Sequence, residues 1–586
     1  MHWSKSYHRK GLVIAGLVIG LAALFLVGRL VVLMLVQSDY YYELAEELHT
    51  RERRIKAARG NIYDRNGVLL AGNETVCTIS VIYNQVTDRE TVIRTLCDEL
   101  ELSEETVRKK VEKYSAREII KTNVSKEIGD RIRSYDLAGI KVDEDYKRYY
   151  PFDDLASAVI GFTGSDNQGI IGLEVTYESV LKGIDGTILT LTDAAGIEID
   201  AAAEDRIEPI AGNNLYLTID ANLQKYAQQA AEKVMEQKGA NSVSILMMNP
   251  QNGEILAMVN VPEFNLNEPF TLNIEAPENI TSEEKQNLLN QMWRNHIISD
   301  TYEPGSTFKT VTAAAALEEG LVSLEETFHC PGYYVVEDRR IRCHKAGGHG
   351  SETFVQATMN SCNPVFIQLG LRLGVNQFHS YFQQLKLSEK TGVDLPGEAA
   401  AIMHNPDNMG EVELATCAFG QSFQVTPLRL LTTISSIING GTTITPHIAK
   451  EIHNAAEDEV EVLSFPSGER VISEETSDSM CYVLEKVVSE GGGIKGAVEG
   501  YLIGGKTATS EKLPRRTGKY IASFYSFVPA DNPQLITLIT IDEPEGVYYG
   551  GTIAAPVVKE IYENVLPYLG IEESVVPETD GAENTN

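Results

Sequence analysis

The sequence is poor in basic residues, in cysteine and in long apolar runs, and each shortage excludes a class of protein. Its 50 lysines and arginines face 83 aspartates and glutamates, a formal net charge of −33. Nucleic-acid-binding proteins carry basic surfaces, so this charge argues against that function. Seven cysteines scattered over 586 residues are too few for a disulfide scaffold. Neither Gly-x-Ser-x-Gly nor His-Glu-x-x-His occurs, which removes two common classes of hydrolase.

The single long apolar segment lies near the N-terminus, at residues 11–36. It is apolar except for Arg29 and long enough to cross a bilayer. It exceeds the apolar core of a secretory signal peptide, and no small-x-small cleavage site follows, so we expect an uncleaved anchor. Lys5, Arg9 and Lys10 favour a cytoplasmic N-terminus, which places the rest of the chain outside the cell. Arg29 either snorkels to the interface or contacts a partner's membrane helix.

The first part of the chain after the anchor is interpreted as a non-catalytic pedestal. Residues 39–59 are charged and are expected to form a stalk helix, and residues 103–126 are expected to form an amphipathic helix. Asn66-Gly67 between short apolar segments predicts a hairpin. The remainder up to residue 206 mixes short strands with glycine turns and contains no cluster of catalytic residue types, which indicates a mixed α/β structural domain.

The larger part of the chain shows the pattern of an α+β domain. Residues 222–238 have apolar residues at helical spacing and stop at a glycine. Strand pairs are expected at 242–259, around Asn252-Gly253, and at 521–541. These pairs predict an antiparallel sheet built from both ends of the domain and flanked by helices. The predicted organisation is a cytoplasmic tail (1–10), the anchor (11–36), the pedestal (37–206), the α+β domain (207–569) and an acidic disordered tail (570–586).

A candidate nucleophile, Ser306, precedes an alanine-rich helix. Lys309 lies one turn further on the same face of that helix. A serine hydroxyl is a poor nucleophile until a base takes its proton, and a neutral lysine amine can be that base. Neutrality requires that burial and neighbouring charge lower the lysine pKa from about 10.4 to about 7. A second Ser-x-x-Lys, at Ser282 to Lys285, is interpreted as the exposed start of a capped helix.

A second candidate segment is Ser361-Cys362-Asn363. In one interpretation Asn363 only caps a helix whose first residue is Pro364. In the other, Ser361 relays a proton and Asn363 orients a substrate amide. The residues alone leave both interpretations open.

A third candidate segment, residues 504–509, leads toward the C-terminal strand pair. Here Lys506 would bind a substrate carboxylate and Thr507 would hydrogen-bond it. The backbone N–H groups of Thr509 and Ser306 would form an oxyanion hole, in which one donor is worth about 2.7–4 kcal/mol. Residues 500–507 also match the phosphate-binding P-loop pattern, but the buried strand before it and the helix after it are not expected here.

The three segments occur in the order of the Ser-x-x-Lys, Ser-x-Asn and Lys-Thr-Gly motifs of penicillin-binding proteins and serine β-lactamases. Residues 59–67, 169–174 with 181–186, 420–427 and 549–556 resemble further motifs of class B penicillin-binding proteins, and the division and sporulation branch is the most similar. The resemblance covers most of the chain. It implies a penicillin-binding transpeptidase domain after the pedestal and the membrane helix.

The resemblance also implies a reaction. Ser306 would attack the penultimate D-Ala carbonyl of a peptidoglycan stem pentapeptide, the terminal D-Ala would leave, and an amine of a neighbouring strand would take the acyl group. β-Lactams would trap Ser306. No cofactor is expected, and the partners implied are a separate membrane glycan polymerase and division or sporulation proteins.

One position departs from the family pattern, because Ala508 stands where the family usually has glycine. Its methyl group is expected to crowd a substrate lying against the strand. The alternative function is therefore a catalytically weak or silent scaffold of the division machinery, or a penicillin-binding sensor, although a sensor would normally need further membrane spans. Formation of an acyl-enzyme at Ser306 distinguishes these alternatives.

Cys330, Cys343, His344 and His349 suggest a zinc site. Their spacing does not match a zinc knuckle, and the adjacent Cys343 and His344 would hardly share one ion. The sequence therefore favours a disulfide among Cys330, Cys343 and Cys362, with unpaired structural thiols as the alternative. No metal is expected.

Overall fold

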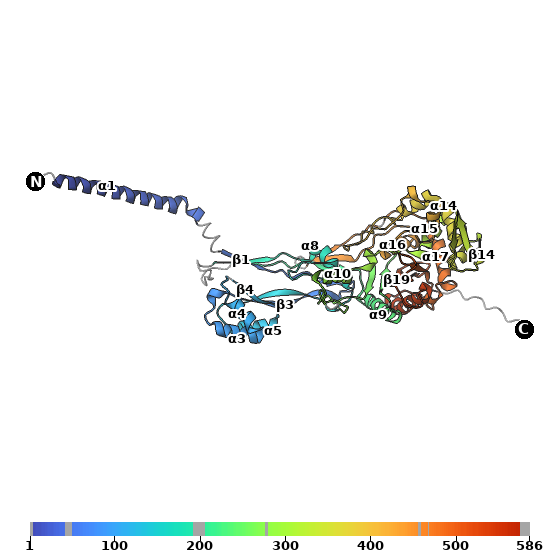
Figure 1. Cartoon of the computed structure of the whole chain (residues 1–586), viewed down its shortest axis with the longest axis horizontal. Coiled ribbons are helices and arrows are strands. Elements are labelled where there is room, and N and C mark those ends of the chain that lie inside the picture. The colour runs from blue at the N-terminus through green and yellow to red at the C-terminus, as the bar shows by residue number, and fades with distance from the viewer. Residues whose placement is uncertain are drawn as a thin grey trace. The chain divides into compact units, whose positions relative to one another are not determined.

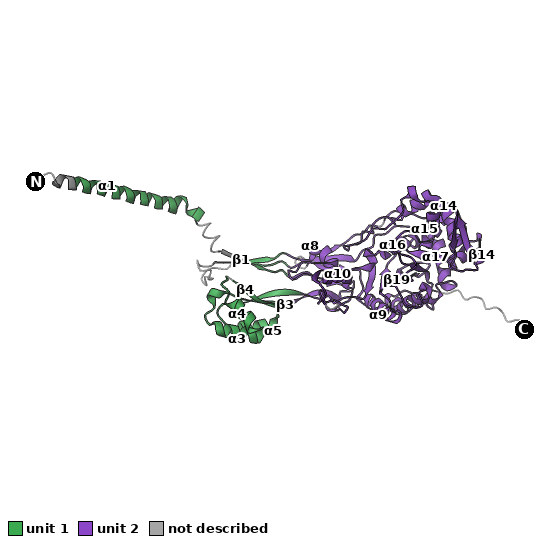
Figure 2. Cartoon of the chain, in the orientation of Figure 1, with its two compact units in different colours: residues 1–57, 75–147, 184–210 green, residues 58–74, 148–183, 211–586 purple. Residues whose placement is uncertain are grey.

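A computed structural model describes residues 4–41, 50–115, 117–191, 205–275, 279–454, 459–466 and 468–574. The chain divides into two compact units, coloured separately in Figure 2, while Figure 1 labels the elements. The first unit comprises residues 1–57, 75–147 and 184–210, and the second comprises 58–74, 148–183 and 211–586. The chain therefore enters the second unit, leaves it and returns twice, whereas the sequence suggested one linear boundary near residue 206.

The first unit begins with helix α1 (Ser4–Val31), which continues into the π-helical turn η1 (Val32–Val36). Arg9–Val36 is the one helical segment in the described part of the chain that is long and apolar enough to cross a membrane. A helix of 28 residues spans about 42 Å. This segment fits the predicted single-pass anchor.

A three-stranded sheet follows in the first unit. Strand β1 (Thr50–Ile55) pairs antiparallel with β6 (Gly186–Leu191), which pairs with β7 (Asp205–Ile207). The stalk helix predicted for residues 39–59 is therefore wrong from Thr50 onward, and residues 42–49 lie outside the described part. A partner strand more than a hundred residues away decides the conformation here, and a charged local sequence cannot reveal it.

The remaining elements of the first unit surround a small apolar core. Helix α4 (Glu104–Val111) begins where the Ser103 hydroxyl accepts a hydrogen bond from Thr106 N, as predicted. It ends early, and residues 118–125 form strand β4 instead of completing the helix predicted for 103–126. Strand β4 pairs with the C-terminal part of β3, which places Ile120 and Val124 in the core. The other elements are β3 (Leu69–Val81), η2 (Tyr83–Gln85), α3 (Arg89–Leu100), α5 (Lys126–Ser134) and β5 (Ile140–Tyr149).

The second unit is built on a five-stranded antiparallel sheet with the order β10-β9-β19-β18-β17. Its strands are β9 (Ser242–Met248), β10 (Ile255–Val261), β17 (Gly504–Glu511), β18 (Tyr520–Val528) and β19 (Leu535–Asp542). The predicted sheet from both ends of the domain, with hairpins at Asn252-Gly253 and near Asp531, is therefore confirmed. Strands β9 and β10 are buried almost throughout, because the sheet is covered on both faces.

Two helix layers cover the sheet. Helices α9 (Ala221–Lys238) and α19 (Ala555–Leu569) share one apolar core with one face. Helix α9 is capped by Asp220 and ends at Gly239, close to the predicted limits. The other face shares a core with further helices. The helices between the two halves of the sheet are α10 (Ser282–Met292), α11 (His296–Ser299), η3 (Gly305–Phe308), α12 (Lys309–Glu318), α13 (Phe354–Met359), α14 (Asn363–Gln384), η4 (Pro406–Asn408), α15 (Glu411–Cys417), α16 (Pro427–Ile438), α17 (Glu474–Ser489) and η5 (Ile494–Gly496), and α18 (Gly550–Ile553) precedes α19.

Further strands complete the second unit. Strand β2 (Ile62–Tyr63) forms the predicted hairpin with β3 and pairs parallel with β8 (Asn214–Leu217), which pairs with β15 (Ala449–Asn454). Two short ribbons lie between α12 and α13 in the chain. They are β11 (Thr327–Cys330) with β14 (Gly350–Thr353), and β12 (Tyr333–Val336) with β13 (Arg339–Arg342). The remaining elements are α6 (Ser157–Ile160), α7 (Gly172–Thr176), α8 (Glu178–Leu181) and β16 (Glu459–Val462).

A buried ion cluster lies in the part of the second unit that the sequence assigned to the pedestal. The carboxylate of Glu174 accepts from Arg59 Nε and from Arg148 Nε, each at 2.6 Å, and Arg59 Nη1 lies 2.8 Å from Glu178 Oε2. The side chains of Arg59 and Glu174 are fully buried. We call Arg59, Arg148, Glu174 and Glu178 the paired cluster.

Candidate active site

Ser306 lies half-buried in the 3-10 helix η3, directly before α12, as the spacing predicts. The preceding Gly305 donates its N–H to the carbonyl of Gly420 at 2.9 Å. A Cβ atom at Gly420 would lie 2.0 Å from the carbonyl oxygen of Gly305, so only glycine allows the two backbones to approach this closely. The segment at 420 therefore fixes the turn that carries Ser306.

Lys309 is fully buried and joins the first two sequence segments. Its Nζ lies 2.7 Å from Ser361 O, 3.0 Å from Ser361 Oγ and 2.7 Å from Asn363 Oδ1. No carboxylate pairs with it among the described residues. Burial lowers the pKa of Lys309 to about 8, and the thiols of Cys362 and Cys343 oppose that change. About a tenth of this amine is therefore neutral at pH 7, far more than of an ordinary lysine.

The Ser-x-Asn segment has an unusual backbone. Ser361 adopts a left-handed φ of 52°, a conformation that costs a non-glycine residue energy and that often occurs at functional sites. Cys362 takes the N-cap position of α14, and Asn363 is already inside the helix. The interpretation in which Asn363 only caps this helix is therefore wrong, because its side chain binds Lys309 and donates to Arg342 O at 3.3 Å.

Strand β17 presents alternate residues to opposite faces. Thr507 and Thr509 line a cleft, and Thr509 Oγ1 accepts from Gly550 N at 3.1 Å. Lys506 is buried on the other face, where its Nζ donates to Thr507 O at 3.2 Å. Burial, together with the charge of Lys309, holds the pKa of Lys506 well below its usual range.

Ala508 shares the buried face of Lys506. Its side chain is 4% exposed, and its methyl would lie 3.5 Å from a Cβ atom added at Gly305. The methyl group thus packs toward the turn before Ser306. Ala508 nevertheless lines the cleft together with Thr507 and Thr509, so the crowding expected from the sequence stays a prediction.

The cleft has a volume of about 560 Å³ and brings the three sequence segments together. Of the predicted site residues, Ser306, Ser361, Asn363, Thr507 and Thr509 line it, while both lysines lie beneath its surface. Sequence reasoning did not assign roles to several lining residues that come from distant segments, namely His344, Gln421, Tyr520, Tyr548 and Tyr549. The family motifs at 420–427 and 549–556 were the available signal for two of them. Residues 504–511 form a strand, which excludes the P-loop alternative.

Comparison with known proteins decides the family. Residues 243–563, more than half of the chain, match the penicillin binding protein transpeptidase domain, and residues 54–217 match the penicillin-binding protein dimerisation domain. The chain is 39% identical to stage V sporulation protein D of Bacillus subtilis, over 93% of this chain and 83% of that protein. The chain belongs to the class B penicillin-binding proteins.

Other proteins similar to this penicillin-binding protein support the same family. It is 28% identical to the peptidoglycan D,D-transpeptidase FtsI of Escherichia coli, over 96% of this chain and 92% of that protein. The crystal structure of penicillin binding protein 2X from Streptococcus thermophilus matches with a TM-score of 0.73 and 22% identity, over 88% of this chain and 80% of that chain. A peptidoglycan synthetase from Bifidobacterium adolescentis matches with a TM-score of 0.73 and 23% identity, over 91% and 98%. These likenesses confirm the predicted α+β fold.

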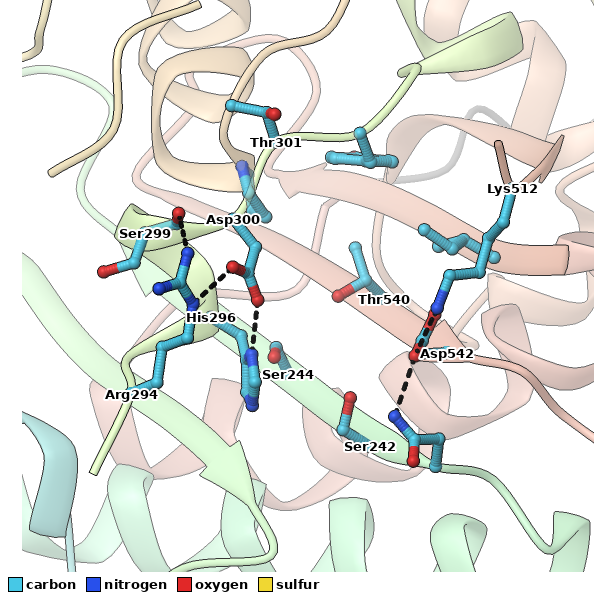
Figure 3. A pocket seen from close by; sticks show the side chains of 14 residues that line it. Ser242, Ser244, Arg294, His296, Ser299, Asp300, Thr301, Lys512, Thr540 and Asp542 are labelled. Atoms are coloured by element: carbon cyan, nitrogen blue, oxygen red, sulfur yellow. Dashed lines mark hydrogen bonds and ion pairs between the residues drawn. The ribbon is translucent and has the colours of Figure 1, made fainter. Parts of the chain in front are cut away.

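A second cavity of this penicillin-binding protein, shown in Figure 3, has a volume of about 460 Å³. It contains none of the predicted site residues. Its charged side chains are paired, since Asp300 binds both Arg294 and His296 at 2.5 Å, and Lys512 lies 2.8 Å from Asp542. The two buried lysines without a carboxylate partner among the described residues, Lys309 and Lys506, lie beneath the other cleft.

Three thiols and an imidazole lie close together beside the cleft. Cys330, Cys343, Cys362 and His349 each offer one ligand atom, and these four atoms lie within 4.8 Å of one another. All seven cysteines are free thiols in the structure, so the disulfide expected among Cys330, Cys343 and Cys362 is not formed in it. The histidine of the group is His349, while His344 lines the cleft.

Proposed function

We propose that this protein is a membrane-anchored serine D,D-transpeptidase that cross-links peptidoglycan stem peptides and is acylated by β-lactams. The observation that carries the proposal is the buried Lys309, whose Nζ binds Ser361 and Asn363 one turn after Ser306. Relatives across the whole length of the chain are named peptidoglycan D,D-transpeptidases, which supports the same reaction.

In the first half of the reaction Ser306 Oγ attacks the penultimate D-Ala carbonyl of the donor peptide, and its proton passes to the neutral amine of Lys309. The backbone N–H groups of Ser306 and Thr509 stabilise the oxyanion. When the tetrahedral intermediate collapses, the C–N bond to the terminal D-Ala breaks. The leaving amine takes a proton through Ser361, whose hydroxyl lies 3.0 Å from Lys309 Nζ.

In the second half an amine of a neighbouring strand attacks the ester of Ser306. Lys309 accepts the proton of that amine, and the Ser306 hydroxyl is restored. Asn363 orients the peptide amide of the donor. Thr507 hydrogen-bonds the donor carboxylate from the cleft, and that carboxylate raises the pKa of Lys506 beneath it, so that Lys506 becomes protonated in the complex.

The same proposal extends to location and partners. The helix at Arg9–Val36 would anchor the chain with its N-terminus in the cytoplasm and the catalytic domain outside the cell. Residues 37–206 would act as a pedestal and 207–569 as the transpeptidase domain. A separate membrane glycan polymerase would supply the strands, together with division or sporulation proteins.

The test uses the full chain purified in detergent and incubated with a fluorescent penicillin. We expect one covalent adduct, located by peptide mass spectrometry on the peptide that contains Ser306. Ser306→Ala should abolish labelling, while the matched variant Ser282→Ala, at the capped start of α10, should keep it. A folded parent chain without an adduct would contradict the proposal and favour the silent scaffold.

A further inference from the structure

We propose that Cys330, Cys343, Cys362 and His349 bind one Zn²⁺ ion, which holds the Ser-x-Asn segment in place. Three thiolates and one imidazole are a common structural zinc set. Zinc binding replaces three thiol protons with the ion and leaves the centre with one negative charge. The proposal reverses the expectation from the sequence, which was a disulfide and no metal.

The geometry already approaches that of a bound ion. Tetrahedral zinc with Zn–S near 2.3 Å and Zn–N near 2.0 Å places its ligand atoms roughly 3.4–3.8 Å apart. Cys343 Sγ lies 3.7 Å from His349 Nδ1, and no pair of the four ligand atoms exceeds 4.8 Å. A contraction of about 1 Å or less would therefore close the site. The three cysteines are buried and His349 is nearly so, which suits a closed structural site that takes no water ligand.

A second observation points independently to a cation. The carboxylate of Glu352 is 3% exposed, and its Oε1 has no hydrogen-bond partner within the described ranges. This oxygen lies 3.8 Å from His349 Nδ1, while Oε2 accepts from Asn360 Nδ2 at 3.0 Å. A buried carboxylate oxygen without a donor is costly, and a cation held by the neighbouring imidazole offsets that cost.

The four proposed ligands come from four segments that an ion would hold together. Cys330 ends β11, Cys343 follows β13, His349 precedes β14 and Cys362 precedes α14. The two ribbons β11–β14 and β12–β13 have only two strands each, and an isolated two-stranded ribbon is marginally stable. A disulfide would use two of the three thiols and leave the third cysteine and His349 outside the link. One ion joins all four segments.

The link has a consequence for the active site, which rests on the function proposed above. Cys362 stands between Ser361 and Asn363, the two residues that bind Lys309 Nζ. Its thiolate, fixed to an ion that is also held by β11 and β14, would keep Ser361 in its left-handed conformation. A displacement of about 1 Å in a catalytic group can cost about 10²-fold in rate, so removal of the ion should slow acylation of Ser306.

The first experiment measures zinc in the full chain, purified in detergent without chelator, by plasma mass spectrometry. We expect about one zinc per chain in the parent and its loss in Cys343→Ser and in His349→Ala. The matched controls are Cys417→Ser and Cys481→Ser, buried thiols outside the group, and His344→Ala, the adjacent histidine; all three should keep the ion. A parent without zinc, or a His349→Ala variant that keeps it, would overturn the proposal.

A second measurement uses only the parent chain, so it does not depend on how well a variant folds. Exchange of zinc for Co²⁺ should produce the thiolate-to-cobalt charge-transfer absorption, and a strong chelator should make three additional thiols reactive. A disulfide among the three cysteines, seen as a mass lower by two hydrogens and no cobalt absorption, would overturn the site. Chelation should also slow penicillin labelling about tenfold or more. Unchanged labelling of a zinc-free chain would overturn the positioning role alone.

Discussion

Two groups of buried cations in the same unit differ in whether a carboxylate accompanies them. In the paired cluster, Arg59 and Arg148 both bind Glu174 at 2.6 Å. Beneath the cleft, Lys309 and Lys506 are buried as deeply, but neither has a carboxylate partner among the residues described. A buried charge is tolerated when it is paired, and otherwise the group shifts its pKa and becomes neutral. Pairing therefore fits a structural role, whereas an unpaired buried lysine with a lowered pKa is what the proposed base, Lys309, requires.

The largest effect is expected from Lys309→Met, which removes the unpaired cation and keeps the volume of the side chain. The rate of acylation by penicillin should fall by about 10²–10⁴-fold, the usual contribution of a general base. The free energy of unfolding should stay the same or increase, because a costly buried ammonium is gone. Stopped-flow labelling and denaturant unfolding measure the two effects. A variant that unfolds much more easily would show that Lys309 is a structural residue.

Glu174→Gln should have the opposite pattern of effects, a loss of stability without a loss of acylation. It leaves Arg59 and Arg148 buried without a carboxylate and should lower the free energy of unfolding by about 3–5 kcal/mol. The matched control is Glu560→Gln, whose exposed pair with Lys233 is worth under about 1 kcal/mol. Acylation per folded molecule should stay at the parent level. Equal stability losses in the two variants would remove the distinction between paired and unpaired cations.

The third prediction concerns pH. The neutral form of Lys309 is the reactive one, so acylation should rise about tenfold per pH unit below 8 and level off above it. The free energy of unfolding should also rise with pH. Below pH 8 both the folded and the unfolded states hold the proton, and the full cost of burying the charge applies. From pH 8 to 10.5, the ordinary pKa of lysine, only the unfolded state keeps the proton, so the free energy of unfolding rises. A flat profile of acylation between pH 6 and 9 would contradict the role of Lys309 as the base.

The smallest effect is expected from Ala508→Gly. A methyl group that faces a ligand changes discrimination by about 10-fold or more. Ala508 lines the cleft, but its side chain is 4% exposed and its methyl packs near Gly305, so little of it can meet a ligand. Acylation should therefore change by less than about tenfold in either direction. A larger gain, measured with the same penicillin, would show that Ala508 does crowd the ligand and would restore the expectation drawn from the sequence.

The sequence was informative wherever the decisive signal was local. Asn252-Gly253 marked a hairpin, and Gly239 marked the end of a helix, because turns and caps depend on adjacent residues. The conformation of residues 50–55 was not predictable, since its partner strand lies at 186–191. The orientation of Ala508 followed only from the pairing of β17.

In the candidate site, too, features set by adjacent residues were predictable and features set by distant segments were not. The turn at Ser306 and the order of the three motifs could be predicted from spacing. The burial of Lys506 and the contacts of Asn363 depend on packing between distant segments, which one sequence does not reveal. The proximity of Cys330, Cys343, Cys362 and His349 could not be predicted for the same reason, since the four residues come from four separate segments and match no compact zinc pattern.

The interleaved chain path limits how this protein can be divided. The second unit includes residues 58–74 and 148–183 in addition to residues 211–586. Within it, Ile62 of the early segment pairs with Leu215. A soluble fragment that started near residue 207 would lose that strand, and with it Arg59 and Glu174. The first unit can be exchanged between relatives only as an insertion with several junctions. Recombination between genes of this family is therefore expected to preserve the fold best where it exchanges the catalytic domain together with these early segments.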